Sequence, residues 1–377
     1  MSLSTLPGRT PADTSHRDDP QPDRLRVAMV APPWFELPPR GYGGTEAVVA
    51  GLVDGLADRG HEVTLLSAGE HRTRASRHHR IYDAPPTGLL GSPLPEVVTA
   101  AETARVLGST ELDVVHDHTL AGPLLAASRP QPTVVTMHGP VTGDNGDYYR
   151  RLGRTVGLVA ISEAQRRLAP DLNWVGTVHN AIDVQSFPFQ ADKDDYLLWL
   201  GRFSPDKGPE LAIEAARRVG RRIVLAGKMN EAEERAYFRD VVRPLLGPDA
   251  EYVGEADATL KRELLAGARA LVFPIQWEEP FGMVMIEAMA CGTPVVALRR
   301  GSVPEVVAHG RSGLVVDRFG DFPAALRVAE GLDPAAVRED AEARFDLPVM
   351  AAGYERVYRQ VLAAEAATAR VRSGVLR

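Results

Sequence analysis

The sequence has very little cysteine and no long hydrophobic run, and both absences narrow the classes of protein to which it can belong. Its 377 residues include one cysteine, Cys291, so no intramolecular disulfide can form and we expect a reducing compartment. Cys291 lies in the apolar run EAMACGTPVVAL, which favours a buried thiol over a nucleophile. No apolar run approaches the roughly 18 residues of a membrane-spanning helix, and residues 1–24 lack the apolar centre of a signal peptide. We therefore expect a soluble cytoplasmic protein.

An excess of positive charge is also absent. The formal net charge is −7, so the chain lacks the basic surface that nucleic-acid-binding proteins need, although a local cationic pocket for a small anion is compatible with it. The composition, 44% hydrophobic and 25% charged, is typical of a folded globular protein. Residues 1–24, rich in Pro, Asp, Arg, Ser and Thr, are the exception, and they are predicted to form a disordered tail.

The rest of the chain alternates short β-rich runs with amphipathic helical stretches. This alternation predicts parallel sheets covered by helices on both faces. In the first half, the predicted strands are residues 24–31, 61–66, 113–116, 133–138 and 157–162, with a helix at 45–60. In the second half they are residues 196–202, 221–228, 251–255, 270–274, 292–298 and 312–317, with helices at 209–220, 231–245 and 259–268.

A polar stretch divides these two sets of elements. Residues 183–195 carry Pro188 and show no helical periodicity, which indicates a linker. A length of 377 residues also favours two cores over one. We therefore predict two Rossmann-like α/β domains, residues 25–185 and 186–348, and a final helix at 349–366 that packs back on the first domain. Ligands of such folds bind beyond the carboxyl ends of the strands, so the cleft between the domains is the expected site.

The motif GYGGTE stands between the first predicted strand and the first helix. Gly43 and Gly44 let the backbone approach a ligand closely, and a helix that starts at Thr45 offers free N–H groups to an anion. The motif is neither GxGxxG nor a Walker loop, because no glycine stands three residues after Gly44 and no Gly-Lys-Ser or Gly-Lys-Thr follows. A plain turn with Thr45 as the N-cap explains the same letters equally well.

The loop GRFSPDKG follows the first strand of the second half and places two cations, Arg202 and Lys207, at the carboxyl end of that strand. Arginine grips a diphosphate with a fork of donors, and lysine adds a mobile point charge. Such cations stabilise the negative charge that develops on a departing diphosphate. A solvated loop is the alternative interpretation, since both residue types are usually exposed.

The segment FPIQWEEPFGMVMIEAMACGTPVV is the most informative part of the chain. Pro280 and Gly282 keep the preceding residues out of a helix, which we expect to start near Met283. The backbone N–H groups of Phe281, Gly282 and Met283 would then be free to bind hydroxyls or phosphate. This geometry is typical of a site for a polar ligand.

Two carboxylates, Glu279 and Glu287, flank this turn. Glu279 lies just before the expected helix start, and Glu287 lies about one turn into the helix, so both can receive hydroxyl groups from one multiply hydroxylated ligand. A first-turn acid favoured by the helix dipole also explains Glu287 when it is considered alone. The combination of acids, glycine and free N–H groups favours a binding site.

Together these motifs resemble the retaining glycosyltransferases of family 4 (glycosyl transferases group 1), which have the two-domain GT-B fold. The resemblance covers residues 26–365 approximately. It rests on GYGGTE, ADRGHEVTLL, VVTMHG, VAISE, HNAID, LGRFSPDKG and EPFGMVMIEAMACGTPVVA. The last two motifs, in this order and with this separation, are very specific.

The resemblance implies roles for individual residues. Glu279 would hold hydroxyls of a donor sugar, Glu287 the ribose of its nucleotide, and Arg202 and Lys207 the diphosphate. His138, in TMHG, would lie near the sugar and the acceptor. The positions whose backbone would approach the donor are Gly43, Gly44, Phe281, Gly282, Met283 and Val284.

Other polar positions fit the family less closely. In HNAID, Ala181 stands where the family commonly has glycine, which leaves the roles of Asn180 and Asp183 open. His118, in HDH, is compatible with an acceptor contact or with a polar strand end, and no third metal ligand at a standard spacing follows this motif. The DKD at residues 192–194 lies in the predicted linker and is interpreted as solvated.

The leading hypothesis is transfer of a sugar, with retention, from a UDP- or GDP-linked donor to a hydroxyl of a glycan, lipid or metabolite. No cofactor and no metal are expected, because Arg202, Lys207 and helix N-termini supply positive charge. A GT-B-fold sugar-nucleotide epimerase and a non-catalytic nucleotide-sugar-binding protein are the alternatives. A glycosidase is disfavoured, since a hydrolase needs no diphosphate site.

Overall fold

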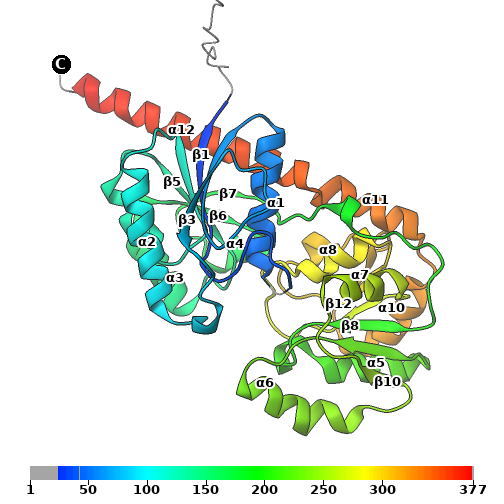
Figure 1. The fold of residues 1–377 in the computed structure, drawn as a ribbon. Helices are drawn as coiled ribbons and strands as arrows, with labels where there is room; N and C mark the ends of the chain where they lie inside the picture. The colour runs from blue at the N-terminus through cyan, green and yellow to red at the C-terminus, as the bar shows by residue number, and fades with distance from the viewer. Residues whose placement is uncertain (1–23, 42, 376–377) are drawn as a thin grey trace, which may run out of the picture.

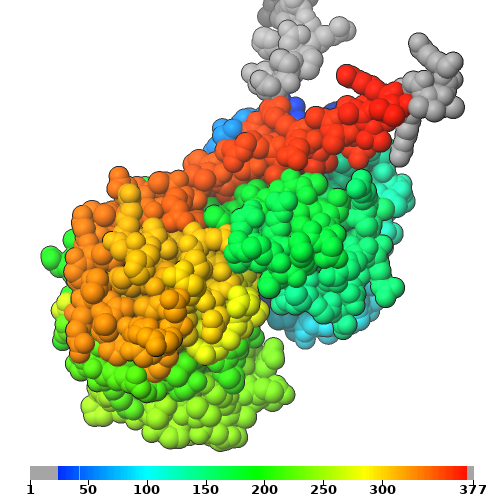
Figure 2. Space-filling model, turned by 180° about the vertical axis from the view of Figure 1, so that it is seen from behind, coloured from blue at the N-terminus to red at the C-terminus, as the bar shows by residue number. Residues whose placement is uncertain are grey.

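The computed structural model describes residues 24–41 and 43–375, so the predicted tail at residues 1–24 lies outside the described part except for Arg24. The chain forms two lobes, one from each half of the sequence, and the C-terminal helix extends from the second lobe along the first (Figure 1). From the opposite side, the two lobes are distinct masses joined beneath this helix (Figure 2). Within the described ranges, no helix combines the length and the hydropathy that crossing a bilayer requires.

The first lobe is built on a parallel sheet of seven strands. They are β1 (Arg26–Val30), β2 (Glu62–Ala68), β3 (Arg77–Tyr82), β4 (Val114–Asp117), β5 (Thr133–Met137), β6 (Gly157–Ala160) and β7 (Trp174–Thr177). Their order across the sheet is β3-β2-β1-β4-β5-β6-β7. The central strands are buried on both faces, as helices on both sides of a sheet require.

The second lobe is built on a parallel sheet of six strands. They are β8 (Leu197–Leu200), β9 (Ile223–Ala226), β10 (Ala250–Tyr252), β11 (Leu271–Phe273), β12 (Val295–Leu298) and β13 (Gly313–Val316). Their order is β10-β9-β8-β11-β12-β13. Cys291 is buried in the core of this lobe, which confirms its prediction as a buried thiol.

Two parallel α/β sheets confirm the predicted fold class. The predicted strands include all six of the second sheet but omit β3 and β7 of the first. These two strands form the edges of the seven-stranded sheet, and their residues are mostly half-buried or exposed. An edge strand has a neighbour on one side only, so its sequence lacks the continuous apolar run by which a central strand is recognised.

Helices and turns connect these strands. The helices are α1 (Gly44–Asp58), α2 (Pro93–Leu107), α3 (Gly143–Leu152), α4 (Glu163–Leu168), α5 (Pro209–Val219), α6 (Ala232–Tyr237), α7 (Ala258–Gly267), α8 (Met283–Ala290), α9 (Val303–Val306), α10 (Phe322–Ala329), α11 (Pro334–Phe345) and α12 (Leu347–Val375). The stretch predicted as one helix at 231–245 continues after α6 as a π turn and then a 3-10 turn. Pro244 lacks an N–H and cannot extend the α-helical pattern.

The last helix, α12, completes the core of the first lobe. It packs closely on α1, because a Cβ at Gly51 or Gly55 would come within 2.6 Å of Leu347 or 2.8 Å of Ala351, respectively. Further along, the hydroxyl of the buried Tyr358 lies 2.7 Å from a histidine ring nitrogen of β4. The C-terminal segment therefore joins the two lobes covalently and by packing.

The predicted linker is anchored to the second lobe. Residues 183–195 contain a single short 3-10 turn, in agreement with the missing helical periodicity. Val184 and Phe187 are nevertheless buried in the second core. Lys193 Nζ donates hydrogen bonds to two backbone carbonyls and a threonine hydroxyl. The interpretation of DKD as solvated is therefore wrong for Lys193, whose partial burial these acceptors offset, while the two flanking aspartates are exposed.

Candidate functional site

The predicted site residues gather where the strand order of each sheet changes direction. This switch lies between β1 and β4 in the first sheet and between β8 and β11 in the second. Crossovers on the two sides of such a point run to opposite faces and leave a crevice beyond the carboxyl ends, where α/β proteins bind ligands. The glycine loop at 43–44 follows β1, Arg202 and Lys207 follow β8, and Glu279 follows β11.

At the second sheet, Lys207, Glu279 and Trp277 form one bonded group. The 3-10 turn Pro205–Lys207 brings Lys207 Nζ to 2.6 Å from Glu279 Oε2. Trp277 Nε1 donates to the same oxygen at 3.0 Å, and Lys207 Nζ lies 4.9 Å from the centre of the Trp277 ring. Glu279 is 8% exposed, so this cation and this carboxylate compensate each other in a largely buried position.

The turn before α8 has the predicted conformation, and the helix starts at Met283. Gly282 has a φ of 78°, and a Cβ there would lie 2.7 Å from Met285 Cε and 3.3 Å from Glu279 Cγ. Both the left-handed backbone and the crowding require glycine. The N–H groups of Met283 and Val284 lie in the first turn, where the helix itself offers them no carbonyl.

Arg202 stands apart from the Lys207 group. Its Nη1 lies 3.3 Å from Glu234 Oε1, while the other oxygen of Glu234 accepts two backbone N–H groups at the start of α6. Lys228, which follows β9, is not among the site residues predicted from the sequence. Burial lowers the pKa of Lys228, and the nearby Arg202 lowers it further. A second cation therefore stands beside Arg202 at the same edge of the sheet.

Glu287 forms an ion pair between two helices. Its Oε1 lies 2.6 Å from Nζ of Lys261 on α7, and its side chain is 12% exposed. This pair is sufficient to explain an acid at this position of α8. The contact of Glu287 with a ribose therefore stays a prediction, and Lys261 is the partner against which it must be tested.

A pocket of about 380 Å³ opens at the carboxyl edge of the first sheet and is lined by Gly43, Gly44 and His138. Gly43 has a φ of 140°, and a Cβ there would lie 3.0 Å from Pro39 Cβ. This turn therefore needs glycine. His118, whose role the sequence left open, lines the same pocket and so belongs to this region of the site.

The two pocket histidines are hydrogen-bonded to each other. His118 Nδ1 lies 2.8 Å from His138 Nε2, and His118 Nε2 lies 3.2 Å from Met29 Sδ. Burial lowers the pKa of His138 to about 4 and that of His118 well below its usual value. Both rings are therefore neutral near pH 7. Both nitrogens of His118 are engaged by these contacts, so Nδ1 of His138 is the ring nitrogen outside them that can bond a ligand.

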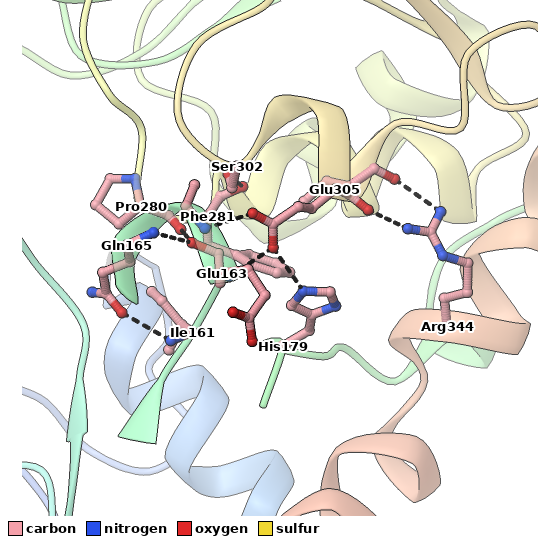
Figure 3. A network of polar contacts seen from close by, with 12 residues as sticks. Ile161, Glu163, Gln165, His179, Pro280, Phe281, Ser302, Glu305 and Arg344 are labelled. Atoms are coloured by element: carbon pink, nitrogen blue, oxygen red, sulfur yellow. Dashed lines mark hydrogen bonds and ion pairs between the residues drawn. The ribbon is translucent and has the colours of Figure 1, made fainter. Parts of the chain in front are cut away.

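A polar network connects the two lobes (Figure 3). It lies between the group of Lys207 and Glu279 in the second lobe and the histidine pocket of the first. Ser162 Oγ donates to the carbonyl of Pro280, next to Glu279, at 2.7 Å, and accepts the N–H of Gln165 at 3.0 Å, which caps α4. Gln165 Nε2 donates to the carbonyls on either side of His138 at 2.8 and 2.9 Å. One serine and one glutamine thus connect the backbone beside Glu279 to the backbone beside His138.

Glu305 of α9 binds the same network from the second lobe. Its carboxylate accepts the N–H groups of Glu163 at 2.7 Å and Ala164 at 2.6 Å, and it lies 3.4 Å from His179 Nε2. Figure 3 shows Arg344 on the other side, where it donates to the backbone carbonyl of Glu305. Burial alone would raise the pKa of the Glu305 carboxyl. The hydrogen bonds from His179 and from the backbone of Glu163 and Ala164 outweigh burial and lower this pKa. Charged hydrogen bonds from Glu305 therefore hold the second lobe against the first.

The remaining polar candidates lie outside the Lys207–Glu279 group and outside the histidine pocket. Asn180 is buried and its side-chain oxygen has no partner among the described residues, while Asp183 is exposed. His116, the first residue of HDH, is fully buried and bonded to Thr136 and Tyr358. In the part of the chain that the structure describes, no three His, Cys, Asp or Glu side chains are arranged to hold a metal ion.

Comparison with protein families identifies both halves of the chain. Residues 42–186 match the family model Glycosyltransferase Family 4, and residues 182–330 match the model Glycosyl transferases group 1. Among curated proteins, the phosphatidyl-myo-inositol mannosyltransferase of Mycolicibacterium smegmatis is 28% identical over 89% of this chain and 94% of its own length.

Solved structures agree with the family models. AviGT4, a glycosyltransferase involved in avilamycin A biosynthesis, is 31% identical, with a TM-score of 0.71 over 90% of this chain and 98% of its own. HepE of Anabaena, solved in complex with UDP-glucose, shares the fold at a TM-score of 0.65 and 15% identity, over 91% of this chain and 100% of its own. The chain therefore belongs to family 4 of the glycosyltransferases, has the GT-B fold and is a glycosyltransferase.

Proposed function

We propose that this enzyme transfers a sugar from a nucleoside-diphosphate donor, UDP- or GDP-linked, to a hydroxyl acceptor, with retention at the anomeric carbon. The observation that carries the proposal is the contact between Lys207 and Glu279 at the switch point of the second sheet. A cation for a diphosphate and a carboxylate for sugar hydroxyls are held there beside the free N–H groups of α8.

The second lobe holds the donor in this proposal. Lys207 has three N–H donors, of which Glu279 takes one, so donors remain for the oxygens of a diphosphate. Arg202 supplies a further positive charge, and Glu287 accepts hydrogen bonds from the ribose. The complex of HepE with UDP-glucose supports a nucleotide-sugar donor for a protein of this fold.

The proposed reaction is a same-face displacement, as the resemblance to the family implies. The bond between the anomeric carbon and the diphosphate oxygen breaks, and the acceptor oxygen forms a bond to the same carbon from the same face. The acceptor proton passes to the departing phosphate oxygen, so no covalent enzyme intermediate forms. Lys207 and the N-terminus of α8 stabilise the charge on the leaving group. His138, neutral near pH 7, contacts the sugar and acceptor through hydrogen bonds.

Metal-independent transfer is part of the proposal, because Lys207, Arg202 and helix N-termini supply the positive field. The test is activity in EDTA. We expect turnover to persist after chelation. Loss of activity in EDTA that manganese or magnesium restores would contradict this part of the proposal.

The donor is tested by incubating the enzyme with UDP-, GDP-, ADP- and TDP-sugars and measuring thermal stability and release of nucleoside diphosphate. We expect one nucleotide to raise the melting temperature and its sugar to be consumed, because a ligand that binds only the folded state stabilises it. Proton NMR of the glycosylated product gives its anomeric configuration. A product with the inverted configuration, or no consumption of any donor, would refute the proposal.

A further inference from the structure

The pocket at the first sheet is lined by acidic and aromatic side chains. Glu46, in the first turn of α1, and Glu96, in the first turn of α2, both line it. No lysine or arginine lines it among the described residues, and its two histidines are neutral near pH 7. The aromatic side chains in its wall are Trp34, Phe35 and Tyr149. Such a wall is suited to a ligand that has apolar faces and hydrogen-bond donors.

Glu46 is buried without a compensating partner. Its side chain is 3% exposed, yet within the described part of the chain no basic residue pairs with it, and the donor that acts on its carboxylate is its own backbone N–H. The other charged group that acts on it is Glu96, which has the same sign. Among the described residues only its own backbone N–H donates to this acid, so a ligand donor in the pocket would add the compensation that the protein itself does not supply.

Glu96 has a fixed position in the same pocket. Its Oε2 accepts the N–H groups of Leu120 at 2.9 Å and Ala121 at 3.3 Å, both just beyond β4. A phosphate or carboxylate in this pocket would meet two acids and no lining cation. A hydroxyl or an ammonium group in the pocket would instead be a donor for Glu46, which lines it.

We propose that this pocket binds the acceptor as an uncharged or amine-bearing polyol, that Glu46 accepts a hydrogen bond from one of its hydroxyl or ammonium groups, and that acceptors bearing phosphate or carboxylate are excluded. The inference rests on the proposed function, since it assigns the acceptor side of the same reaction. It makes Glu46 the residue that determines the charge class of the acceptor.

Saturation-transfer NMR with the full chain, saturated with its nucleoside diphosphate, tests this inference. The probes are glucose, glucosamine, glucose 6-phosphate and glucuronate. We expect glucose or glucosamine to bind at least tenfold more tightly than either anion. Glu46→Gln keeps the shape of the side chain and should weaken glucosamine at least tenfold. The double variant Glu46→Gln/Glu96→Gln should admit glucose 6-phosphate.

Three outcomes would overturn the inference. They are binding of an anionic probe as tight as that of the neutral and amino probes, failure of both glucose and glucosamine to bind, and unchanged probe affinities in Glu46→Gln. Glu111→Gln is the matched control, because Glu111 is 91% exposed and pairs with Arg26 far from the pocket, so it should leave every affinity unchanged. If the wild type fails to bind any nucleoside diphosphate, the proposed function fails. Intact nucleotide binding with the wrong probe preference refutes this inference alone.

Discussion

The two switch points of the molecule have the same topology and different charged side chains. Beyond β8 and β11, the cations Lys207 and Arg202 each pair with a glutamate at the edge of the second sheet. Beyond β1 and β4, two acids without a paired cation among the described residues, Glu46 and Glu96, line a pocket at the edge of the first sheet. The same fold therefore carries different charged side chains at its two switch points, and under the proposed function these side chains, and not the fold, determine which ligand each lobe accepts.

The two regions also differ in how their acids are compensated. In the second lobe, Glu279 pairs with Lys207 and Glu287 pairs with Lys261. In the first lobe, no cation among the described residues compensates Glu46. We therefore expect the protein to lose stability when one partner of a pair in the second region is removed. We expect it to gain stability when the buried acid of the first region is made neutral.

The largest effect is expected for Lys207→Met. It removes the charge that stabilises the leaving diphosphate, so kcat/KM should fall by about 100- to 1000-fold. It also leaves the buried Glu279 unpaired, which should cost roughly 3–5 kcal/mol of unfolding free energy. Steady-state kinetics and urea unfolding measure the two effects.

A double variant separates stability from activity at this pair. Lys207→Met/Glu279→Gln should recover most of the lost stability, because the buried charge is gone, and none of the lost activity. Arg299→Ala, which removes an exposed cation paired with Asp317, is the control and should change neither. Near-wild-type kinetics of Lys207→Met would remove the diphosphate assignment.

Glu46→Gln should stabilise the protein in a pH-dependent manner. Burial, with a smaller contribution from Glu96, raises the pKa of Glu46 to about 7 in the folded chain, from 4.5. The folded state therefore favours the protonated acid, and stability is lost as the pH rises from 4.5 through 7. At pH 8 the variant should be more stable than the wild type by on the order of 2–3 kcal/mol, and at pH 5 by under about 1 kcal/mol. Urea unfolding at both pH values measures this, and an equal difference at both would contradict it.

Substitution of Glu279 and of Glu287 in the second lobe should affect different quantities, kcat and nucleotide affinity respectively. Glu279→Gln should lower kcat strongly with little change in nucleoside diphosphate binding, because the sugar is absent from that ligand. Glu287→Gln should weaken nucleoside diphosphate binding by roughly 1.5–3 kcal/mol, the value of a charged hydrogen bond. Calorimetric titration measures both. Lys261→Met is the necessary comparison: if it weakens binding as much as Glu287→Gln, then the ion pair, and not a ribose contact, explains Glu287.

The smallest effect is expected at the contact between the lobes. Ser162→Ala removes the N-cap of α4 and the hydrogen bond to Pro280, so it should cost about 1 kcal/mol of stability and lower kcat a few-fold. Asp333→Ala removes the N-cap of α11, away from both groups, and should cost similar stability with unchanged kcat. Equal kcat values in the two variants would show that the contact between the lobes does not position the site.

Much of the second lobe could be predicted from the sequence because its signals are local. The strand before Arg202, the turn at Gly282 and the helix start at Met283 depend on neighbouring residues, and the structure has them as predicted. The pairing of Lys207 with Glu279 spans 72 positions and follows only from the arrangement of the strands.

The first lobe was harder to predict for physical reasons. Glu46 follows the glycine loop and has the pattern of an ordinary first-turn acid, so its burial without a partner depends on packing that the sequence does not display. The role of His118 stayed open because its bond to His138 connects residues that follow two different strands, β4 and β5. The contact between Ser162 and Pro280 requires both lobes to be placed.

The most direct test of this division of charge is calorimetric titration of UDP and GDP into the wild type, Lys207→Met and Glu46→Gln. We predict that one nucleotide binds the wild type, that Lys207→Met weakens it at least tenfold, and that Glu46→Gln changes its affinity less than twofold. Nucleotide binding that is unchanged in Lys207→Met, or weakened equally in both variants, would contradict the assignment of donor and acceptor to separate lobes.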